Sequence, residues 1–486
     1  MKTFLNSLLN IFKISFKIVL VLVIAYTSFS YLSRVFYNRE VERELSFHSL
    51  PENTMDVIVL GSSHAEYSFV PHFFYQETGL YSYVLGTACQ PLEVSYQMLR
   101  ESLKTQNPKA VILEVYTAMP LRSICEDDSC YVLGEYQMTG EEKYNTINYL
   151  PKEKAKTYYN DFINYHNDWK TTRTLNIFKP ENMLKTKGDD FSEDFGYIFK
   201  YAPFDLPEKW YPAQVHDSSE NLDVKLDELD LESLNNIKKL CDEENIQLIL
   251  YKTPIDGIDI ENQSYLHKVW EWAEDNNVPY YDFVAKGHDL GFYMWIHSDS
   301  FHCYVNGAGL ITENLASFVN DLNIDFNHQE NQRITEKLIG RGQFMLGDYI
   351  SGEMDPLKYL KLMDNFNGYV FFRYNPTAYK VDDELLDLLS KMGFKDKFDP
   401  NKPFFAILKD NELLVYDTNP FEHEIDNHKI TISYDGITID DVAYINADCK
   451  MSLVYSDYNF IAKVNKVIEY RGKVWQYDVQ SYIIDF

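Results

Sequence analysis

Short apolar runs alternate with amphipathic stretches over the first two thirds of the chain. Three runs have the length and composition of buried parallel strands: MDVIVLG (55–61), KAVILEVY (109–116) and IQLILYKTP (246–254). A shorter run, VPYYDF (278–283), is consistent with a last strand. Helical stripes lie between and after them, formed by Leu92, Tyr96, Leu99 and Leu103, and by Leu231, Leu234, Ile237 and Cys241. This alternation predicts an α/β fold with a doubly wound, mainly parallel sheet.

The longest uncharged run lies near the N-terminus, from Ile18 to Ser33, and the apolar residues 14–16 extend it past Lys17, which can snorkel. No A-x-A-like cleavage site follows it. We therefore expect an uncleaved transmembrane signal anchor over 14–36 rather than a cleaved signal peptide. Early lysines favour a cytoplasmic N-terminus over 1–13, although Arg34 and Arg39 weaken that bias. The expected localisation is the cell membrane, single-pass, with the rest of the chain extracytoplasmic.

The chain has 486 residues, enough for two or three domains. The alternating pattern covers 37–322, interrupted by an insertion over 117–220 that contains Trp169 and Trp210. A polar segment over 323–335 is typical of a linker. Residues 336–486 begin with mixed helix and strand patterns and end in tyrosine-rich strands, which predicts an accessory α+β domain. The aromatic residues suit either a sugar-binding cleft or ordinary packing.

Charge and cysteine content narrow the possible functions. The formal net charge is −29, which would repel a phosphate backbone and argues against nucleic-acid binding. Cys125 and Cys130 flank an acidic loop and could close a small disulfide in an oxidising compartment. The other cysteines fit buried apolar positions. No Walker A, Rossmann glycine, HExxH or kinase signature occurs, and no cofactor is implied.

Candidate chemistry lies at two distant points of the chain. Gly61 permits a tight turn after the first strand, and Ser62 and Ser63 follow it. Far downstream, Asp299 and His302 have a D-x-x-H spacing. His302 is a candidate base for the Ser63 hydroxyl, and Asp299 a candidate to orient the imidazole. Taken singly, such a serine is more often a helix cap, and such a spacing is a common accident. A metal site formed by His297, Asp299 and His302 is a weaker alternative, because no further ligand cluster supports it.

Together these segments resemble the SGNH (GDSL-like) hydrolase superfamily over about residues 52–322. GSSH (61–64) resembles its first block, G-D-S, with Ser62 in place of the usual Asp, and DSFH (299–302) resembles its last block. YVLGTACQ (83–90) resembles its second block, in which Gly86 matches the glycine whose amide helps form the oxyanion hole. The resemblance implies Ser63, Asp299 and His302 as the catalytic residues, Ser63 and Gly86 as oxyanion donors, and no metal.

The third block departs from the family pattern. The family has a G-x-N-D motif there, whereas this stretch reads LEVYTAMP (113–120) and contains no Asn. Either Tyr116 or Thr117 substitutes, or the oxyanion hole has only backbone donors. Losing one such donor typically costs about 10²–10³ in rate.

The G-S-S form is similar to that of membrane-anchored relatives that help O-acylate bacterial wall and exopolysaccharide polymers. It implies acyl transfer to or from a surface polysaccharide through an acyl-Ser63 intermediate, beside a membrane-bound O-acyltransferase partner. A carbohydrate or lipid esterase with the same triad is one alternative. The other is a non-catalytic glycan-binding or scaffold protein. The segments 367–394 and 402–417 also resemble, in part, the carbohydrate-associated ILEI/FAM3-type module.

Overall fold

The computed structural model describes the α/β region, most helices and the C-terminal strands. The described residues are 2–35, 46–118, 140–149, 152, 155, 191–200, 222–254, 260–283, 302–352, 356–367, 369–374, 383–395, 397–399, 401–425, 427–434, 436–445, 451–455, 460–463, 467–470, 473–476 and 480–483. The predicted Cys125–Cys130 loop, Trp169 and Trp210 lie outside these residues.

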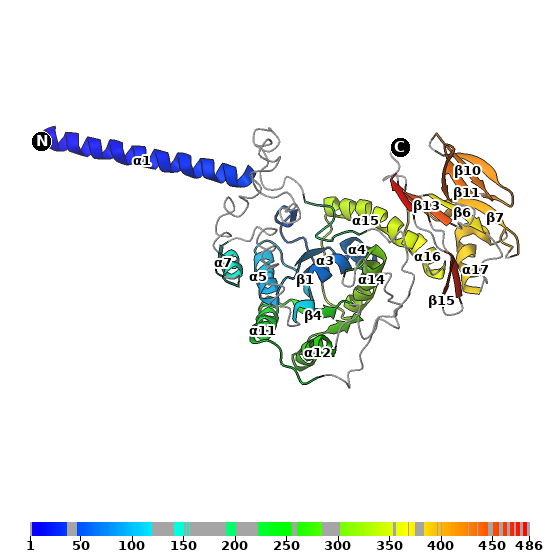
Figure 1. The fold of residues 1–486 in the computed structure, drawn as a ribbon, viewed down its shortest axis with the longest axis horizontal. Coiled ribbons are helices and arrows are strands. Elements are labelled where there is room, and N and C mark those ends of the chain that lie inside the picture. Colours follow the sequence, from blue (N-terminus) through cyan, green and yellow to red (C-terminus); the bar gives the residue numbers. More distant parts are fainter. Residues whose placement is uncertain are drawn as a thin grey trace.

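The chain begins with one long apolar helix, α1 (Lys2–Val35). Its residues 11–28 are all exposed, and the window Ile11–Ser28 is apolar enough to cross a membrane. At about 1.5 Å per residue, its 34 residues exceed the ~30 Å of a hydrocarbon core. Figure 1 shows it as a single helix standing apart from the sheet. A signal sequence has the same properties, so the anchor and its topology stay predictions.

The central sheet has five strands in the order β2-β1-β3-β4-β5. They are β1 (Val57–Ser62), β2 (Ser82–Thr87), β3 (Ala110–Glu114), β4 (Gln247–Lys252) and β5 (Tyr280–Asp282). All four neighbouring pairs are parallel, so the carboxyl ends of the strands share one edge. Every residue of β1, β2 and β3 is buried. Such two-sided burial explains why these strands are nearly continuous apolar runs.

Helices cover both faces of this sheet (Figure 1). Because side chains alternate along a strand, Val57 and Val59 join the apolar cluster that contains α4 and α14, whereas Ile58 and Leu60 join the one that contains α5, α11 and α12. This arrangement confirms the predicted doubly wound, parallel α/β fold. The helices of this region are α3 (Ser63–Ser68), α4 (Pro71–Thr78), α5 (Leu92–Ser102), η2 (Tyr116–Ala118), α7 (Gly140–Tyr149), α11 (Glu228–Glu243), α12 (Ile260–Asp275) and α14 (Val305–Asp321).

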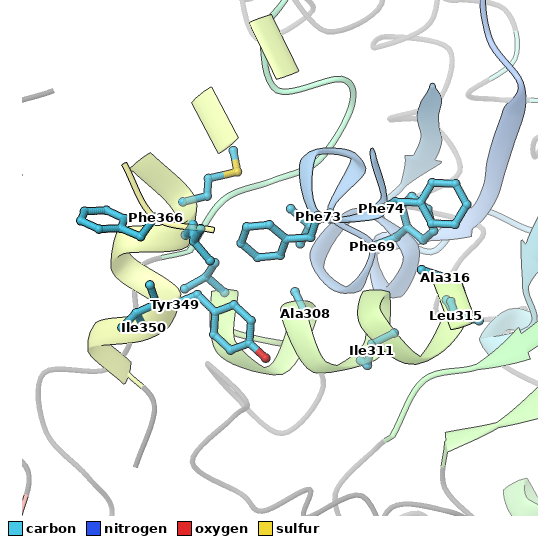
Figure 2. Packing of buried hydrophobic residues seen from close by; sticks show 14 of the residues in the cluster. Phe69, Phe73, Phe74, Ala308, Ile311, Leu315, Ala316, Tyr349, Ile350 and Phe366 are labelled. Carbon is cyan, nitrogen blue, oxygen red and sulfur yellow. The ribbon is translucent and has the colours of Figure 1, made fainter. Parts of the chain in front are cut away.

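The segment predicted as a linker lies against the α/β region. His328 Nδ1 is 2.6 Å from an Asp56 carboxylate oxygen, and the Asn331 amide donates to the Tyr81 hydroxyl at 2.8 Å. Helix α15 (Gln332–Gly352) begins within this segment. Figure 2 shows Tyr349 and Ile350 in the same apolar cluster as Phe73 and other residues of α4 and α14. The domain boundaries stay a prediction, but α15 shares the core of the α/β region.

The C-terminal region contains antiparallel sheets and helices, as the predicted α+β organisation requires. One sheet has the order β17-β14-β13-β6-β7-β8, a second β12-β11-β10-β9, and β15 pairs with β16. Phe371 and Ile407 of the first sheet share an apolar cluster with Ile430 and Ile437 of the second. The elements are α16 (Pro356–Met363), β6 (Tyr369–Tyr374), α17 (Asp383–Leu389), η8 (Ser390–Phe394), β7 (Phe404–Lys409), β8 (Glu412–Asp417), β9 (Phe421–Ile425), β10 (His428–Ser433), β11 (Gly436–Ile439), β12 (Val442–Ile445), β13 (Met451–Tyr455), β14 (Phe460–Lys463), β15 (Val467–Tyr470), β16 (Lys473–Gln476) and β17 (Gln480–Ile483).

Candidate active site

The turn between β1 and α3 places Ser63 at the carboxyl edge of the sheet. Gly61 has φ +145°, a conformation that residues with a Cβ rarely adopt. A Cβ at Gly61 would also lie 2.6 Å from the Glu114 Cβ. Ser62 then caps α3, since its hydroxyl oxygen accepts from the His64 amide at 3.2 Å. Ser63 is therefore the first residue of a helix at the edge where α/β folds place their sites.

His302 reaches this serine from the other end of the α/β region. Its Nε2 lies 2.8 Å from Ser63 Oγ, although 239 residues separate the two in sequence. His302 lies just before α14, which packs against α3 and α4. Both side chains are half-buried, so the hydroxyl is neither sealed in the core nor fully solvated. The structure thus brings together two of the three predicted catalytic residues. Asp299 and the alternative metal ligand His297 lie outside the described residues.

Aromatic rings surround the Ser63–His302 pair. The Tyr67 ring centroid is 4.7 Å from that of His302, and Lys200 Nζ lies 4.4 Å from the Tyr67 centroid. On another side, the His64 ring is 5.5 Å from His302 and stacks on Tyr116 at 3.7 Å. Neither Tyr67 nor His64 was predicted as a site residue from the sequence. The sequence feature that could have indicated them is their position within four residues of Ser63.

Gly86, the predicted oxyanion residue, lies beside the serine turn. It pairs with Gly61 in the β1–β2 register. A Cβ at Gly86 would lie 2.9 Å from the Ser62 carbonyl oxygen and 3.1 Å from that of Gly61. Strands β1 and β2 can approach this closely here only because residue 86 is a glycine. The backbone of Gly86 is therefore close to the candidate nucleophile, while its role as a donor stays a prediction.

The two residues proposed to replace the missing Asn differ in their surroundings. The Thr117 hydroxyl donates to the Gln90 carbonyl at 2.9 Å, so its single proton is already committed. Tyr116 instead lies at the site, where its ring stacks on His64. Of the two, only Tyr116 remains a candidate.

A buried carboxyl that no sequence motif indicates lies beneath the serine turn. Glu114 ends β3 and accepts hydrogen bonds from the Ser62 hydroxyl at 3.0 Å, the Tyr116 amide at 2.8 Å and the Thr253 hydroxyl at 3.4 Å. Thr253 Oγ1 is also 3.0 Å from His64 Nδ1. Burial raises the pKa of Glu114 to about 7, although these hydrogen bonds oppose the rise. The sequence feature that could have indicated Glu114 is an acidic residue at the end of the apolar run AVILE.

A second buried charge lies one strand away. Lys252, at the end of β4, is fully buried, and its Nζ donates to Gln263 Oε1 at 2.8 Å. Burial lowers the pKa of Lys252 to about 8, while Asp282 and Glu114 oppose this. Within the part of the chain that the structure describes, no three His, Cys, Asp or Glu side chains gather as a metal site would require.

The fold and this geometry define a class: an α/β protein with a serine–histidine pair at the carboxyl edge of a five-stranded parallel sheet. No protein-family model matches the sequence, and no curated protein matches it.

Two solved structures are similar to this chain, each over 57% of its length and at 10% sequence identity. One is a proposed acylhydrolase from Bacteroides fragilis, with a TM-score of 0.29 and 93% of that chain covered. The other is a GDSL-like lipase from Bacteroides thetaiotaomicron, with a TM-score of 0.28 and 95% of that chain covered.

Proposed function

We propose that this protein is a membrane-tethered serine acyl-transfer enzyme, with Ser63 as nucleophile and His302 as general base. The observation that supports it is the 2.8 Å separation of His302 Nε2 and Ser63 Oγ. A serine hydroxyl attacks a carbonyl effectively only when a base within hydrogen-bond reach removes its proton. A serine that merely capped a helix would need no histidine at that distance.

The proposed reaction has two symmetrical halves. Ser63 Oγ bonds to the carbonyl carbon of an ester while His302 Nε2 takes the hydroxyl proton. The tetrahedral intermediate then expels the alcohol, which takes that proton from His302 and leaves acyl-Ser63. In the second half, an acceptor hydroxyl attacks acyl-Ser63, His302 takes its proton, and the proton returns to Ser63 Oγ on release.

Two further roles belong to this proposal. Asp299 orients the His302 ring and stabilises the imidazolium formed in each half. The amides of Ser63 and Gly86 donate to the oxyanion, in a hole without a side-chain Asn. Of the two side chains considered as a substitute for that Asn, Tyr116 is the one whose ring lies at the site, stacked on His64.

The proposed acceptor is a hydroxyl on a cell-surface polysaccharide. An N-terminal helix of membrane-spanning length would hold Ser63 near the outer face of the membrane, where a membrane-bound O-acyltransferase could supply the acyl group. The resemblance of GSSH (61–64) to membrane-anchored O-acylating relatives supports the same acceptor. If water attacks acyl-Ser63 instead, the identical residues make an esterase.

A fluorophosphonate probe tests the nucleophile, because it bonds covalently to an activated serine. We expect labelling of the full-length protein in detergent, loss of labelling in Ser63→Ala, and severe loss in His302→Ala. Ser433→Ala, in the C-terminal strand β10, is the matched control and should label normally. Labelling that persists in Ser63→Ala would place the nucleophile elsewhere. An unlabelled wild type would leave the scaffold alternative.

An acyl-enzyme experiment then separates transferase from esterase. The protein is reacted with p-nitrophenyl acetate, and acetyl-Ser63 is identified by mass spectrometry. Purified envelope polysaccharide is then added to the acetylated protein. Acetyl groups recovered on the polymer support the transferase, whereas free acetate formed at the same rate with and without polymer supports the esterase.

A further inference from the structure

Glu114 is a buried carboxyl that the proposed reaction does not use. It is fully buried at the end of β3, beside β1 in the sheet. Its Cβ occupies the space that a side chain at Gly61 would need, with the two Cβ positions only 2.6 Å apart. The serine turn is therefore built directly over this carboxyl. Burying a carboxylate is unfavourable unless its oxygens accept hydrogen bonds, so the donors around Glu114 identify the residues that it positions.

One arm of contacts leads from Glu114 to the residue before the nucleophile. The Ser62 hydroxyl donates its proton to Glu114 Oε2 at 3.0 Å, as it must once the carboxyl is ionised, above its pKa of about 7. With its proton directed at Glu114, the Ser62 oxygen presents lone pairs to the His64 amide at 3.2 Å. The carboxylate thereby fixes the direction of the cap that starts α3.

The other arm leads to the residue after the nucleophile. Glu114 Oε1 accepts from the Thr253 hydroxyl at 3.4 Å. Because the Thr253 proton points to Glu114, Thr253 Oγ1 must accept at its other contact, the 3.0 Å contact with His64 Nδ1. This contact holds His64 as the tautomer that carries a proton on Nδ1. Both arms therefore end on the neighbours of Ser63, namely Ser62 and His64.

We propose that Glu114 is the positioning residue of the nucleophile, holding Ser62 and His64 so that Ser63 Oγ stays within reach of His302. This inference rests on the proposed acyl-transfer function. The hydrogen-bond partners of Glu114 are Ser62, Tyr116 and Thr253 rather than Ser63, so it acts on the nucleophile through the turn. A glutamine in its place would reverse one contact. If its oxygen stays on Tyr116 and Thr253, its amide would donate to Ser62, which would then receive two donors and lose the acceptor for its own proton.

The test measures the rate of serine labelling separately from probe binding. Full-length wild type, Glu114→Gln, Ser62→Ala and the double variant are reacted with the fluorophosphonate probe, which yields a maximal labelling rate and a probe affinity for each. Glu101→Gln is the matched control, because Glu101 is also buried but pairs with Lys104 away from the site. Thermal unfolding confirms that each variant is folded.

Above pH 7, where Glu114 is mostly ionised, we expect Glu114→Gln to lower the maximal labelling rate about tenfold to a hundredfold with unchanged probe affinity, as the loss of a charged hydrogen bond predicts. Glu101→Gln should stay within about twofold of wild type. The double variant should lose no more than the worse single variant, because Ser62 and Glu114 act as one unit.

Wild-type labelling rates in folded Glu114→Gln would overturn the inference, and so would fully additive losses in the double variant. If Glu114→Gln does not fold, Ser62→Ala decides, since it removes the same hydrogen bond from the other partner; a folded Ser62→Ala that labels at the wild-type rate refutes the role. Failure of the proposed function has a different result, since the wild type itself would then not label at Ser63.

Discussion

The buried Glu114 carboxyl should leave a measurable signature in the pH dependence of stability. Burial raises its pKa from 4.5 to about 7 in the folded protein, and Glu114 is exposed to water once the chain unfolds. At about 1.4 kcal/mol for each pH unit, this difference corresponds to about 3 kcal/mol of unfolding free energy. The perturbation that isolates it is Glu114→Gln, which keeps the size of the side chain and removes its titration.

The sign of the effect follows from proton binding. Between pH 4.5 and about 7, the folded protein holds the Glu114 proton and the unfolded chain does not. The contribution to stability is therefore fully present below pH 4.5 and is lost as the pH rises through about 7. We expect the unfolding free energy of wild type, minus that of Glu114→Gln, to fall by about 3 kcal/mol across this range.

The comparison must be a difference between variants, because another buried group titrates in the opposite sense. Burial lowers the pKa of His72 from 6.5 to about 4. The unfolded chain therefore binds a proton that the folded His72 refuses, and stability from this group rises between pH 4 and 6.5. In wild type the two effects largely cancel. His72→Gln is therefore a control. The unfolding free energy of wild type minus that of His72→Gln should rise with pH, whereas the corresponding difference for Glu114→Gln should fall.

Urea unfolding of the full-length protein in non-ionic detergent, followed by tryptophan fluorescence, measures both differences. Titrations are made at several pH values below 4.5 and above 7. A wild-type minus Glu114→Gln difference that stays constant, or that grows with pH, would refute the reasoning. It would mean that Glu114 is solvated or stays ionised in the folded protein.

The remaining predictions use other parts of the molecule. Gly61→Ala should lower stability by about 1–3 kcal/mol and abolish labelling, because the added methyl meets Glu114 in a backbone region unsuited to alanine; thermal unfolding at the wild-type temperature would contradict this. A chain ending at Met363 keeps α15 against the α4–α14 face but loses Val370 and Phe404 of the same apolar cluster, so it should stay folded with a lower unfolding temperature and weaker polymer binding. A chain ending at Thr335 exposes the α4–α14 face and should aggregate. If the two truncated chains elute alike in gel filtration, α15 does not belong to the core of the α/β region. Asp299→Asn should slow labelling no more than His302→Ala does, since orientation rather than proton acceptance is lost. Protease added to intact cells should digest the chain beyond residue 37, and protection until lysis would reverse the topology.

The sequence alone predicted four of the five strands of the parallel sheet. The apolar runs at 55–61, 109–116, 246–254 and 278–283 each cover most or all of a strand of the sheet, because strands buried on both faces require nearly uninterrupted apolar residues. The remaining strand, β2, was not predicted as such, because its sequence SYVLGT contains polar and small residues. These residues are buried only once other segments of the folded chain pack around them.

The candidate site could be predicted only in part. Ser63 and His302 belong to short motifs whose order along the chain indicates their chemistry, and the structure places their side chains 2.8 Å apart. Asp299 lies outside the described residues and stays a prediction. Glu114 had no motif, because its role depends on contacts with Ser62, at the end of β1, and Thr253, just after the end of β4.

The tertiary structure also decided how the segments after 322 meet the sheet. The polar composition of 323–335 is typical of an exposed linker, yet His328 and Asn331 bind Asp56 and Tyr81. Helix α15 then adds Tyr349 and its neighbours to the core of the α/β region. Local patterns report which residues prefer to be buried or exposed over a few turns or strand repeats. Which surfaces bury them depends on contacts between residues hundreds of positions apart, and only the folded chain brings those together.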